Sequence, residues 1–219
     1  MDLPEDASEL ISKAVSSPTT TVIERFAIPI TGRDLKTLSG CNWLNDEVIN
    51  FYFELIAERS ANRIHIFNTF FYPKLKDSGY TAVRRWSLKA DIFGKDRVLL
   101  PIHLGNHWCC AEISFAEKTI FYYDSLHGTN PLCLKLLKEY LESEHADKKG
   151  GPLPDAADWK LCAPTDRIPP QQNGYDCGVF TCVMAEYRSR GAQFTFSQAD
   201  MSYFRRRLAY EIITGRLLE

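Results

Sequence analysis

Three β-prone runs that follow one another over residues 97–126 constrain the fold more than any other feature of this chain. They read RVLLPIHL, HWCCAEISF and TIFYYDSL; each contains β-branched and other apolar residues, and the last two also contain aromatic residues. A short turn near AEK joins the second run to the third, which predicts an antiparallel hairpin. The chain must therefore contain a sheet in which antiparallel pairing holds at least two strands.

Helical patterns stand on both sides of these runs. The stretch NWLNDEVINFYFELIAERS offers Asn45 as an N-cap, acidic residues in the first turn, and then Val48, Ile49 and Tyr52 on a buried face. The stretch NPLCLKLLKEYLESEH begins with Asn130 as a cap and a proline at the first helical position. Both stretches predict helices.

Two more helical patterns close the chain. CGVFTCVMAEYRSRG is apolar on most sides and ends at Gly191, while SQADMSYFRRRLAYEIITG opens with Ser197 and Asp200 in capping-box spacing. Arg205, Arg206 and Arg207 of the second pattern are predicted to form a solvated face. Because helices and strands mix without strict alternation, the predicted fold class is α+β.

Length and composition predict a single folded domain. With 219 residues, of which 45% are hydrophobic, the chain can bury an ordinary core. Residues 1–25 are expected to form a polar segment, with SSPTTT exposed ahead of a body that spans residues 26–219. A surface loop is expected at ADKKGGPLPDAAD.

Charge and hydropathy exclude several classes of partner. The formal charge is −2, so no sequence-wide attraction drives the chain toward nucleic acid or an anionic membrane. The longest apolar runs fall well short of the roughly 20 residues that a membrane-spanning helix needs. The N-terminus MDLPEDASEL is acidic and lacks the pattern of a secretory signal.

The seven cysteines indicate free thiols in a reducing compartment. Their number is odd, and none stand in a C-x-x-C pair. Five histidines make zinc worth considering, but Cys109-Cys110 and Cys177/Cys182 lack finger or ribbon spacing. We therefore expect no metal and no cofactor.

Cys177 is a candidate nucleophile because of where it stands. A turn-prone stretch, PPQQNGYD, precedes it and a probable helix follows, so it should occupy the first helical turn, where free N–H groups and the helix dipole favour the thiolate. Gly174 and Gly178 are expected to leave room for a substrate backbone. The alternative is a small apolar residue in a core helix, which is the role we assign to Cys182.

His107 is the best candidate for the base that such a nucleophile needs. The other histidines weighed, His65, His127 and His145, stand in positions typical of surface or packing residues. If the hairpin loop comprises residues 115–118, Asp124 falls diagonal to His107 on one face, with Cα atoms roughly 7–8 Å apart. Gln171, in the loop before Cys177, can supply an amide to the oxyanion that forms during attack on a carbonyl.

Six segments together resemble the catalytic domain of the SUMO-specific proteases of the Ulp/SENP family. They are WLNDEVINFY, NTFFYPKL, GYTAVRRW, LLPIHLGNHW, YYDS and QQNGYDCG, in family order from about residue 26 to the C-terminus. The resemblance implies a papain-like cysteine protease fold, with a mixed central sheet flanked by helices. It also implies cleavage after the C-terminal diglycine of SUMO, in precursors or in lysine conjugates.

The resemblance implies roles for individual residues. Cys177 is the nucleophile, His107 the general acid and base, Asp124 its orienting partner and Gln171 the oxyanion donor. Further residues are implied to contact the modifier, with two tryptophans roofing a tunnel for its diglycine tail: Trp43, Trp108, Asp46, Phe70, Arg85 and His103. His127 departs from the pattern, since a small residue is expected in its place.

Other functions stay open at this stage. The same chemistry could act on another ubiquitin-like modifier, an acyltransferase could use the same Cys-His framework, or the chain could be a modifier-binding module with a dead site. The implied partners are SUMO and SUMO-conjugated proteins, met by a monomer without nucleic acid or membrane. The implied location is the nucleus or nuclear periphery, with the cytoplasm as an alternative.

Overall fold

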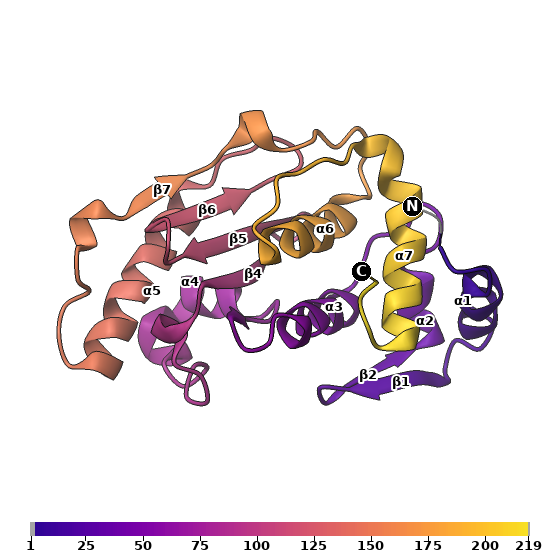
Figure 1. The fold of residues 1–219 in the computed structure, drawn as a ribbon, viewed down its shortest axis with the longest axis horizontal. Helices are drawn as coiled ribbons and strands as arrows, with labels where there is room; N and C mark the ends of the chain where they lie inside the picture. The colour runs from indigo at the N-terminus through magenta and orange to yellow at the C-terminus, as the bar shows by residue number, and fades with distance from the viewer. Residues whose placement is uncertain (1–2, 219) are drawn as a thin grey trace.

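A five-stranded mixed sheet forms the centre of the computed structural model, which describes residues 3–218 (Figure 1). The outer pairs β3–β4 and β6–β7 are parallel, whereas β4–β5 and β5–β6 are antiparallel. The α+β class and the mixed sheet expected from the sequence are confirmed. In order across the sheet, the strands are β3 (Ile64–Ile66), β4 (Arg97–His103), β5 (Trp108–Ser114), β6 (Thr119–Tyr123) and β7 (Lys160–Cys162).

Helices cover both faces of this sheet because successive strand residues point to opposite sides. On β4, Val98 and Leu100 enter one core and Leu99 enters the other. The core on the Val98 side contains α4 (Phe71–Val83) and α5 (Pro131–Lys149). The core on the Leu99 side contains α3 (Asp46–Arg59), α6 (Cys177–Ser189) and α7 (Met201–Thr214).

Short 3-10 turns complete the described secondary structure of this body. They connect the longer elements and include the entry into α7. Their bounds are η1 (Ile92–Gly94), η2 (Ala156–Asp158), η3 (Thr165–Arg167) and η4 (Gln198–Asp200).

The hairpin β5–β6 has the register that the sequence predicts. Ser114 pairs with Thr119, so residues 115–118 form the loop. Cys110 pairs with Tyr123, and this register carries on to set Cys109 opposite Asp124 just beyond the end of β6. The hairpin therefore brings residues 107 and 124 to the same end of the sheet.

Side-chain caps begin the helices where the sequence predicts them. The Asn45 side chain accepts a hydrogen bond from the N–H of Val48 at the start of α3, and Pro131 follows the Asn130 cap of α5. Ser197 and Asp200 form a capping box, but it caps the 3-10 turn η4 that leads into α7. Each cap satisfies backbone donors that the helix itself leaves free.

The expectation that the folded body begins only at residue 26 is wrong, although residues 16–21 are exposed as predicted. Helix α1 (Ala7–Val15) buries Ala7 and Ala14 and contacts α7, and strand β1 (Thr21–Arg25) pairs with β2 (Ile28–Thr31), which leads into α2 (Gly32–Lys36). A boundary after residue 25 would cut this hairpin. The polar composition hid a narrow apolar stripe, on which Ile11 and Val15 reach the core.

The expected loop at residues 146–158 begins later than predicted. Helix α5 continues through Lys149, and Gly150 ends it in the left-handed conformation at φ 76°. Lys148 and Lys149 lie in the last turn, where cations interact favourably with the helix dipole. The four residues ADKK are thus helical, and the loop starts at the glycine.

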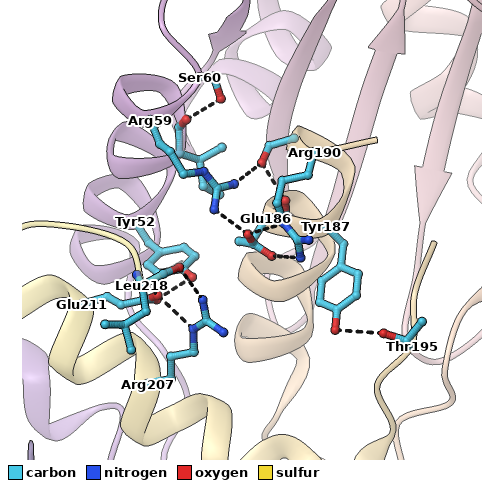
Figure 2. A network of polar contacts seen from close by, with 12 residues as sticks. Tyr52, Arg59, Ser60, Glu186, Tyr187, Arg190, Thr195, Arg207, Glu211 and Leu218 are labelled. Carbon is cyan, nitrogen blue, oxygen red and sulfur yellow. Dashed lines mark hydrogen bonds and ion pairs between the residues drawn. The ribbon is translucent and has the colours of Figure 1, made fainter. Parts of the chain in front are cut away.

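A polar network joins α3, α6 and α7 on the side away from the sheet (Figure 2). The Tyr52 hydroxyl donates to Glu211 at 2.8 Å, and Arg207 donates to the same carboxylate at 2.9 Å. Arg59 and Arg190 both pair with Glu186. These bonds hold α3 and α7 in position beside α6. No helix within residues 3–218 has the length and apolar content needed to cross a membrane.

Candidate active site

Cys177 is the first residue of α6, as the sequence predicts. Asn173 shapes the turn before it: its side-chain oxygen accepts the N–H groups of Tyr175 and Asp176 at 3.1 and 3.0 Å. The Asn173 amide donates in turn to the Asp176 carboxylate at 2.6 Å. This closed turn sets the direction in which the chain enters α6, and it leaves Cys177 only 3% exposed.

Arg205 anchors this turn to the C-terminal helix. Its Nε donates to Asp176 Oδ1 at 2.8 Å, and another nitrogen donates to the carbonyl of Tyr175. The remaining donors reach the carbonyls of Thr37 and Asn42. One buried guanidinium therefore holds the nucleophile's turn against the loop that leads to Trp43.

The prediction of a solvated arginine face on α7 is wrong. Arg205 is 5% exposed, beside the buried Phe204, and Arg207 is half-buried against Glu211. Only Arg206 is exposed. The buried face of α7 is wider than its apolar residues indicate, because a carboxylate and backbone carbonyls satisfy the Arg205 guanidinium.

His107 and Asp124 meet at the end of the β5–β6 hairpin. His107 Nε2 lies 2.7 Å from Asp124 Oδ1, and the N–H of Leu126 donates to the same oxygen at 2.8 Å. His107 stands directly before β5 and Asp124 directly after β6. The contact predicted from an even hairpin register is confirmed.

The Cys177 thiol lies close enough to the His107 imidazole for each side chain to shift the pKa of the other. Burial raises the pKa of Cys177, but the bonds from His107 and from the backbone N–H of Trp108 lower it more, so the net pKa lies below its ordinary value. The two side chains are therefore within reach, and the sulfur is biased toward the thiolate.

The His107 imidazole is biased toward its charged form. Burial lowers its pKa, but the hydrogen bonds to Asp124 and to neighbouring thiols raise it above the ordinary 6.5. Burial raises the pKa of Asp124, but the hydrogen bonds from His107 and from the Leu126 N–H lower it by more, so the net pKa lies below its ordinary value. The directions of these pKa shifts favour an ionised thiol, imidazole and carboxyl group at the site.

Gly128 gives the Asp124 carboxylate its space. A Cβ at Gly128 would lie 2.4 Å from Asp124 Oδ2, too close for any side chain without displacing the carboxylate. His127 adopts φ 58°, a left-handed conformation that explains why a small residue is expected there. Its ring nitrogen bonds to the carbonyl of Ile168 at 2.8 Å, which holds the turn closed.

Gln171 is buried and held in a fixed orientation by Ser125. The Ser125 hydroxyl donates to Gln171 Oε1 at 2.7 Å, and the N–H of Gln171 donates to the Ser125 carbonyl at 2.7 Å. Its amide nitrogen donates to the Asn173 carbonyl in the nucleophile's turn. The sequence interpretation did not single out Ser125. Its position directly after Asp124 is the signal that could have identified it.

A cleft of about 390 Å³ gathers five of the six residues implied to bind the modifier. Trp43 and Phe70 are 52% and 56% exposed at its edge, whereas Trp108 is 6% exposed and stacks on His103 with ring centroids 4.1 Å apart. Asp46 is the fifth of these residues and also lines the cleft. Arg85 is exposed beyond the end of α4 and does not line this cleft.

Trp108 joins the cleft to the sulfur. Its indole N–H donates to the Leu44 carbonyl at 3.2 Å, and its backbone N–H lies close enough to Cys177 to help lower the pKa of that thiol. Gly178 permits this arrangement, because a Cβ there would lie 2.8 Å from the Cβ of Leu44. The close neighbour of Gly178 is thus Leu44 of the chain itself, not the substrate backbone that the sequence interpretation expected; Gly174 has open space around it.

Cys109 is a residue that the sequence interpretation did not assign to the site. It shares the His107 face of β5 because strand residues two apart point to the same side. Its thiol is fully buried and accepts a hydrogen bond from Tyr122 at 3.1 Å, and its sulfur and one donor atom each from His107 and Asp124 lie within 4.8 Å of one another. The strand periodicity could have revealed it.

A larger cavity, of about 710 Å³, is lined by none of the predicted site residues. Its walls include Phe121, Phe194 and Arg188. Arg188 is paired with Glu112 at 2.6 Å and with Glu117 at 3.1 Å, so its charge is already neutralised. The candidate site is therefore identified by its reactive side chains and not by the size of its cavity.

A cysteine at the start of a buried helix, facing a histidine and an aspartate on a mixed sheet, is the arrangement of the papain-like cysteine proteases. The comparisons narrow the class further. Residues 42–217 match the model of the Ulp1 protease family, C-terminal catalytic domain, and the chain belongs to this family.

Curated relatives cover the whole chain. It is 46% identical over 225 residues to a sentrin-specific protease of Caenorhabditis elegans, and the match covers 100% of this chain and 32% of that protein. It is 38% identical to the human sentrin-specific protease 2, over 100% of this chain and 38% of the relative. The chain therefore spans about a third of the length of these relatives.

A solved structure supports the same assignment. The C-terminal Ulp1 protease domain in complex with Smt3, the yeast orthologue of SUMO, superposes with a TM-score of 0.86 at 36% identity. The match covers 98% of this chain and 96% of that one. The structural likeness thus extends over nearly the full length of both chains, and it confirms the papain-like α+β fold.

Proposed function

We propose that this chain is a cysteine protease domain that cleaves after the C-terminal diglycine of SUMO. One observation carries the proposal: the hydrogen-bonded pair His107 and Asp124 lies beside the Cys177 thiol, next to the tryptophan-lined cleft of a Ulp1-family chain. The relatives add support, since they are sentrin-specific proteases and a Ulp1 domain solved with Smt3.

The acylation step uses the ion pair directly. The Cys177 thiolate attacks the carbonyl carbon of the last glycine, and the carbonyl oxygen becomes an oxyanion. The backbone N–H of Cys177 and the side-chain amide of Gln171 donate to that oxyanion. His107 gives its proton to the departing amine, a lysine side chain or a short C-terminal peptide, and a thioester remains on Cys177.

Hydrolysis of the thioester regenerates the site. Neutral His107 takes a proton from a water molecule as the water attacks the thioester carbonyl. The tetrahedral intermediate collapses, the glycine carboxylate leaves, and the thiolate returns to its bond with the imidazolium. Asp124 stays ionised throughout, because the hydrogen bonds from His107 and Leu126 lower its pKa.

The cleft explains selectivity for a glycine tail. Trp43 and Trp108 line it together, and a tail without Cβ atoms is the one that fits between closely spaced aromatic walls. Phe70, His103 and Asp46 line the same cleft and are proposed to contact the modifier. Arg85 lies outside it, so we propose a contact with the body of the modifier and not with its tail.

A SUMO molecule with an electrophile at its C-terminus tests the proposal. We expect it to form a covalent adduct that maps to Cys177 by mass spectrometry, and the Cys177→Ala variant to bind SUMO without reacting. Cys41→Ser is the matched control, since Cys41 is an exposed thiol and its loss should leave labelling unchanged.

Other outcomes would reassign the function. Labelling by a different ubiquitin-like modifier, with SUMO left unlabelled, would transfer the proposal to that modifier. Acetylation from acetyl-CoA without hydrolysis of any modifier would support an acyltransferase. Binding of SUMO without turnover by the wild-type protein would indicate a binding module.

We further propose the biological setting that the family resemblance implies. SUMO and SUMO-conjugated proteins are the partners, no nucleic acid or membrane takes part, and the domain acts as a monomer. The proposed location is the nucleus or nuclear periphery, with the cytoplasm as an alternative. Light scattering and imaging of the tagged protein test these points.

A further inference from the structure

Cys109 lies against the catalytic pair, yet the proposed reaction does not use it. Its side chain is fully buried, and its sulfur lies within 4.8 Å of a donor atom of the His107 imidazole and of the Asp124 carboxylate. The Tyr122 hydroxyl donates to its sulfur at 3.1 Å, which leaves the thiol proton directed at other acceptors. Three different metal-binding side chains therefore converge at one point.

We propose that His107, Cys109 and Asp124 form a Zn²⁺ site, and that an ion bound there reversibly switches the protease off. One donor atom from each residue lies within 4.8 Å of the other two. In a tetrahedral zinc site with ligand bonds of about 2.0–2.3 Å, neighbouring donors lie about 3.3–3.8 Å apart. The three atoms thus need only small side-chain movements to enclose an ion.

The donor set suits zinc by type as well as by distance. Imidazole nitrogen, thiolate sulfur and carboxylate oxygen are the three ligand classes that Zn²⁺ takes in proteins, and three protein ligands leave a fourth position for water. A thiolate, a carboxylate and a neutral imidazole balance the charge of the ion, so no unpaired charge stays buried. The sequence interpretation did not single out this site, although the hairpin register places Asp124 beside His107 and strand periodicity places Cys109 on the same face.

The surroundings would hold the ligands in place. The Tyr122 hydroxyl already donates to Cys109, and the Leu126 N–H already donates to Asp124 at 2.8 Å. Such outer bonds orient ligands in metal sites. The His107 and Asp124 side chains are 14% and 8% exposed, which gives the ion access to the site.

Zinc at this site would stop turnover by occupying a ring nitrogen. His107 Nε2 faces Asp124, so the ion replaces the 2.7 Å hydrogen bond there and the one remaining ring proton stays on Nδ1. An imidazole in this state cannot take a proton from water, so the thioester cannot be hydrolysed. A chelator that removes the ion restores the hydrogen bond and the activity.

The first experiment measures metal binding without activity. Co²⁺ added to the Cys177→Ala protein should give the near-ultraviolet sulfur-to-cobalt charge-transfer band of a cysteine ligand. The same protein with Cys109→Ser should lose that band, while Cys41→Ser should keep it. An identical band in all three proteins would overturn the proposed site.

The second experiment measures inhibition, and it rests on the proposed function. Zn²⁺ should inhibit hydrolysis of a SUMO fluorogenic substrate, and a chelator should reverse the inhibition. Cys109→Ser should raise the inhibitory Zn²⁺ concentration at least about tenfold, since loss of an outer partner alone weakens metal affinity 10–100-fold. Equal inhibition of wild type and Cys109→Ser would place the zinc on Cys177 and sink the proposal.

The Co²⁺ experiment tests the metal site, and the inhibition assay depends in addition on the proposed protease function, so a failure of one claim can be told from a failure of the other. If Cys109→Ser is inactive in metal-free buffer, Cys109→Ala replaces it in the inhibition assay. If the wild-type protein with chelator fails to hydrolyse the substrate, the proposed function fails, while the Co²⁺ result still decides whether the site binds metal.

Discussion

Replacing Arg205 by methionine is the sharpest test of how this structure holds the turn before Cys177. Arg205 is 5% exposed, and its guanidinium donates to Asp176, the residue before Cys177, as well as to three backbone carbonyls. Methionine keeps much of the apolar stem but removes every donor. Asp176 would keep Asn173 and Gln198 as donors, yet its buried charge would lose its cation.

The expected loss of stability follows from burial on both sides. The Arg205 and Asp176 side chains are 6% and 4% exposed, and removing one partner of a buried ion pair costs about 3–5 kcal/mol. For a chain of this size, each kcal/mol lowers the melting temperature by about 2–4 °C, so we expect a fall of roughly 6–20 °C.

Urea unfolding followed by circular dichroism measures this loss, and the neighbouring residue supplies the control. Arg206 is exposed, and among residues 3–218 its side chain bonds only to Ser8, so Arg206→Met should change the free energy of unfolding by less than about 0.5 kcal/mol. A loss below about 1 kcal/mol for Arg205→Met, or equal losses for both variants, would refute the reasoning. A double-mutant cycle with Asp176→Asn should show a favourable coupling between the two side chains.

Three further predictions concern the site and its supports. Gly128→Ala places a Cβ 2.4 Å from Asp124 Oδ2, so kcat for SUMO hydrolysis should fall by up to about 100-fold with KM little changed; an unaltered kcat would show that the carboxylate tolerates displacement. Asn45→Ala removes the cap of α3 and should lower the free energy of unfolding by about 1 kcal/mol in urea titrations, and no loss would mean that the Val48 N–H finds another acceptor. Burial raises the pKa of Cys177, but its hydrogen bonds lower it more, to below the ordinary value. In buffer that contains a chelator, the rate at which iodoacetamide alkylates Cys177 should therefore level off at a lower pH than for a free thiol. Without His107, burial dominates and the midpoint should move upward; a midpoint unchanged in His107→Ala would contradict the ion pair.

Local sequence signals predicted the parts of the site that depend on short-range geometry. An even hairpin loop at residues 115–118 was enough to set Asp124 beside His107, because register determines which face a strand residue occupies. Turn residues before an apolar run were enough to place Cys177 at a helix start. Family motifs then pointed to the residues that line the cleft.

Other predictions failed where distant packing decides the outcome. The polar composition of residues 7–25 predicts exposure, but α1 buries its narrow apolar stripe beside α7. Gly178 was assigned to the substrate, but it accommodates Leu44. In each case the neighbour that matters is far away in the sequence, so no local pattern could reveal it.

By itself, the sequence indicated the helices that begin at Asp46, Pro131 and Cys177, the β5–β6 hairpin register and a thiol at the start of a helix, because period, caps and turns act over a few residues. Only the tertiary structure decided which arginine of FRRR is buried and that Leu44 lies beside Gly178. The physical reason is that burial depends on contacts between segments remote in the chain. A guanidinium becomes an anchor only when the fold supplies its partners.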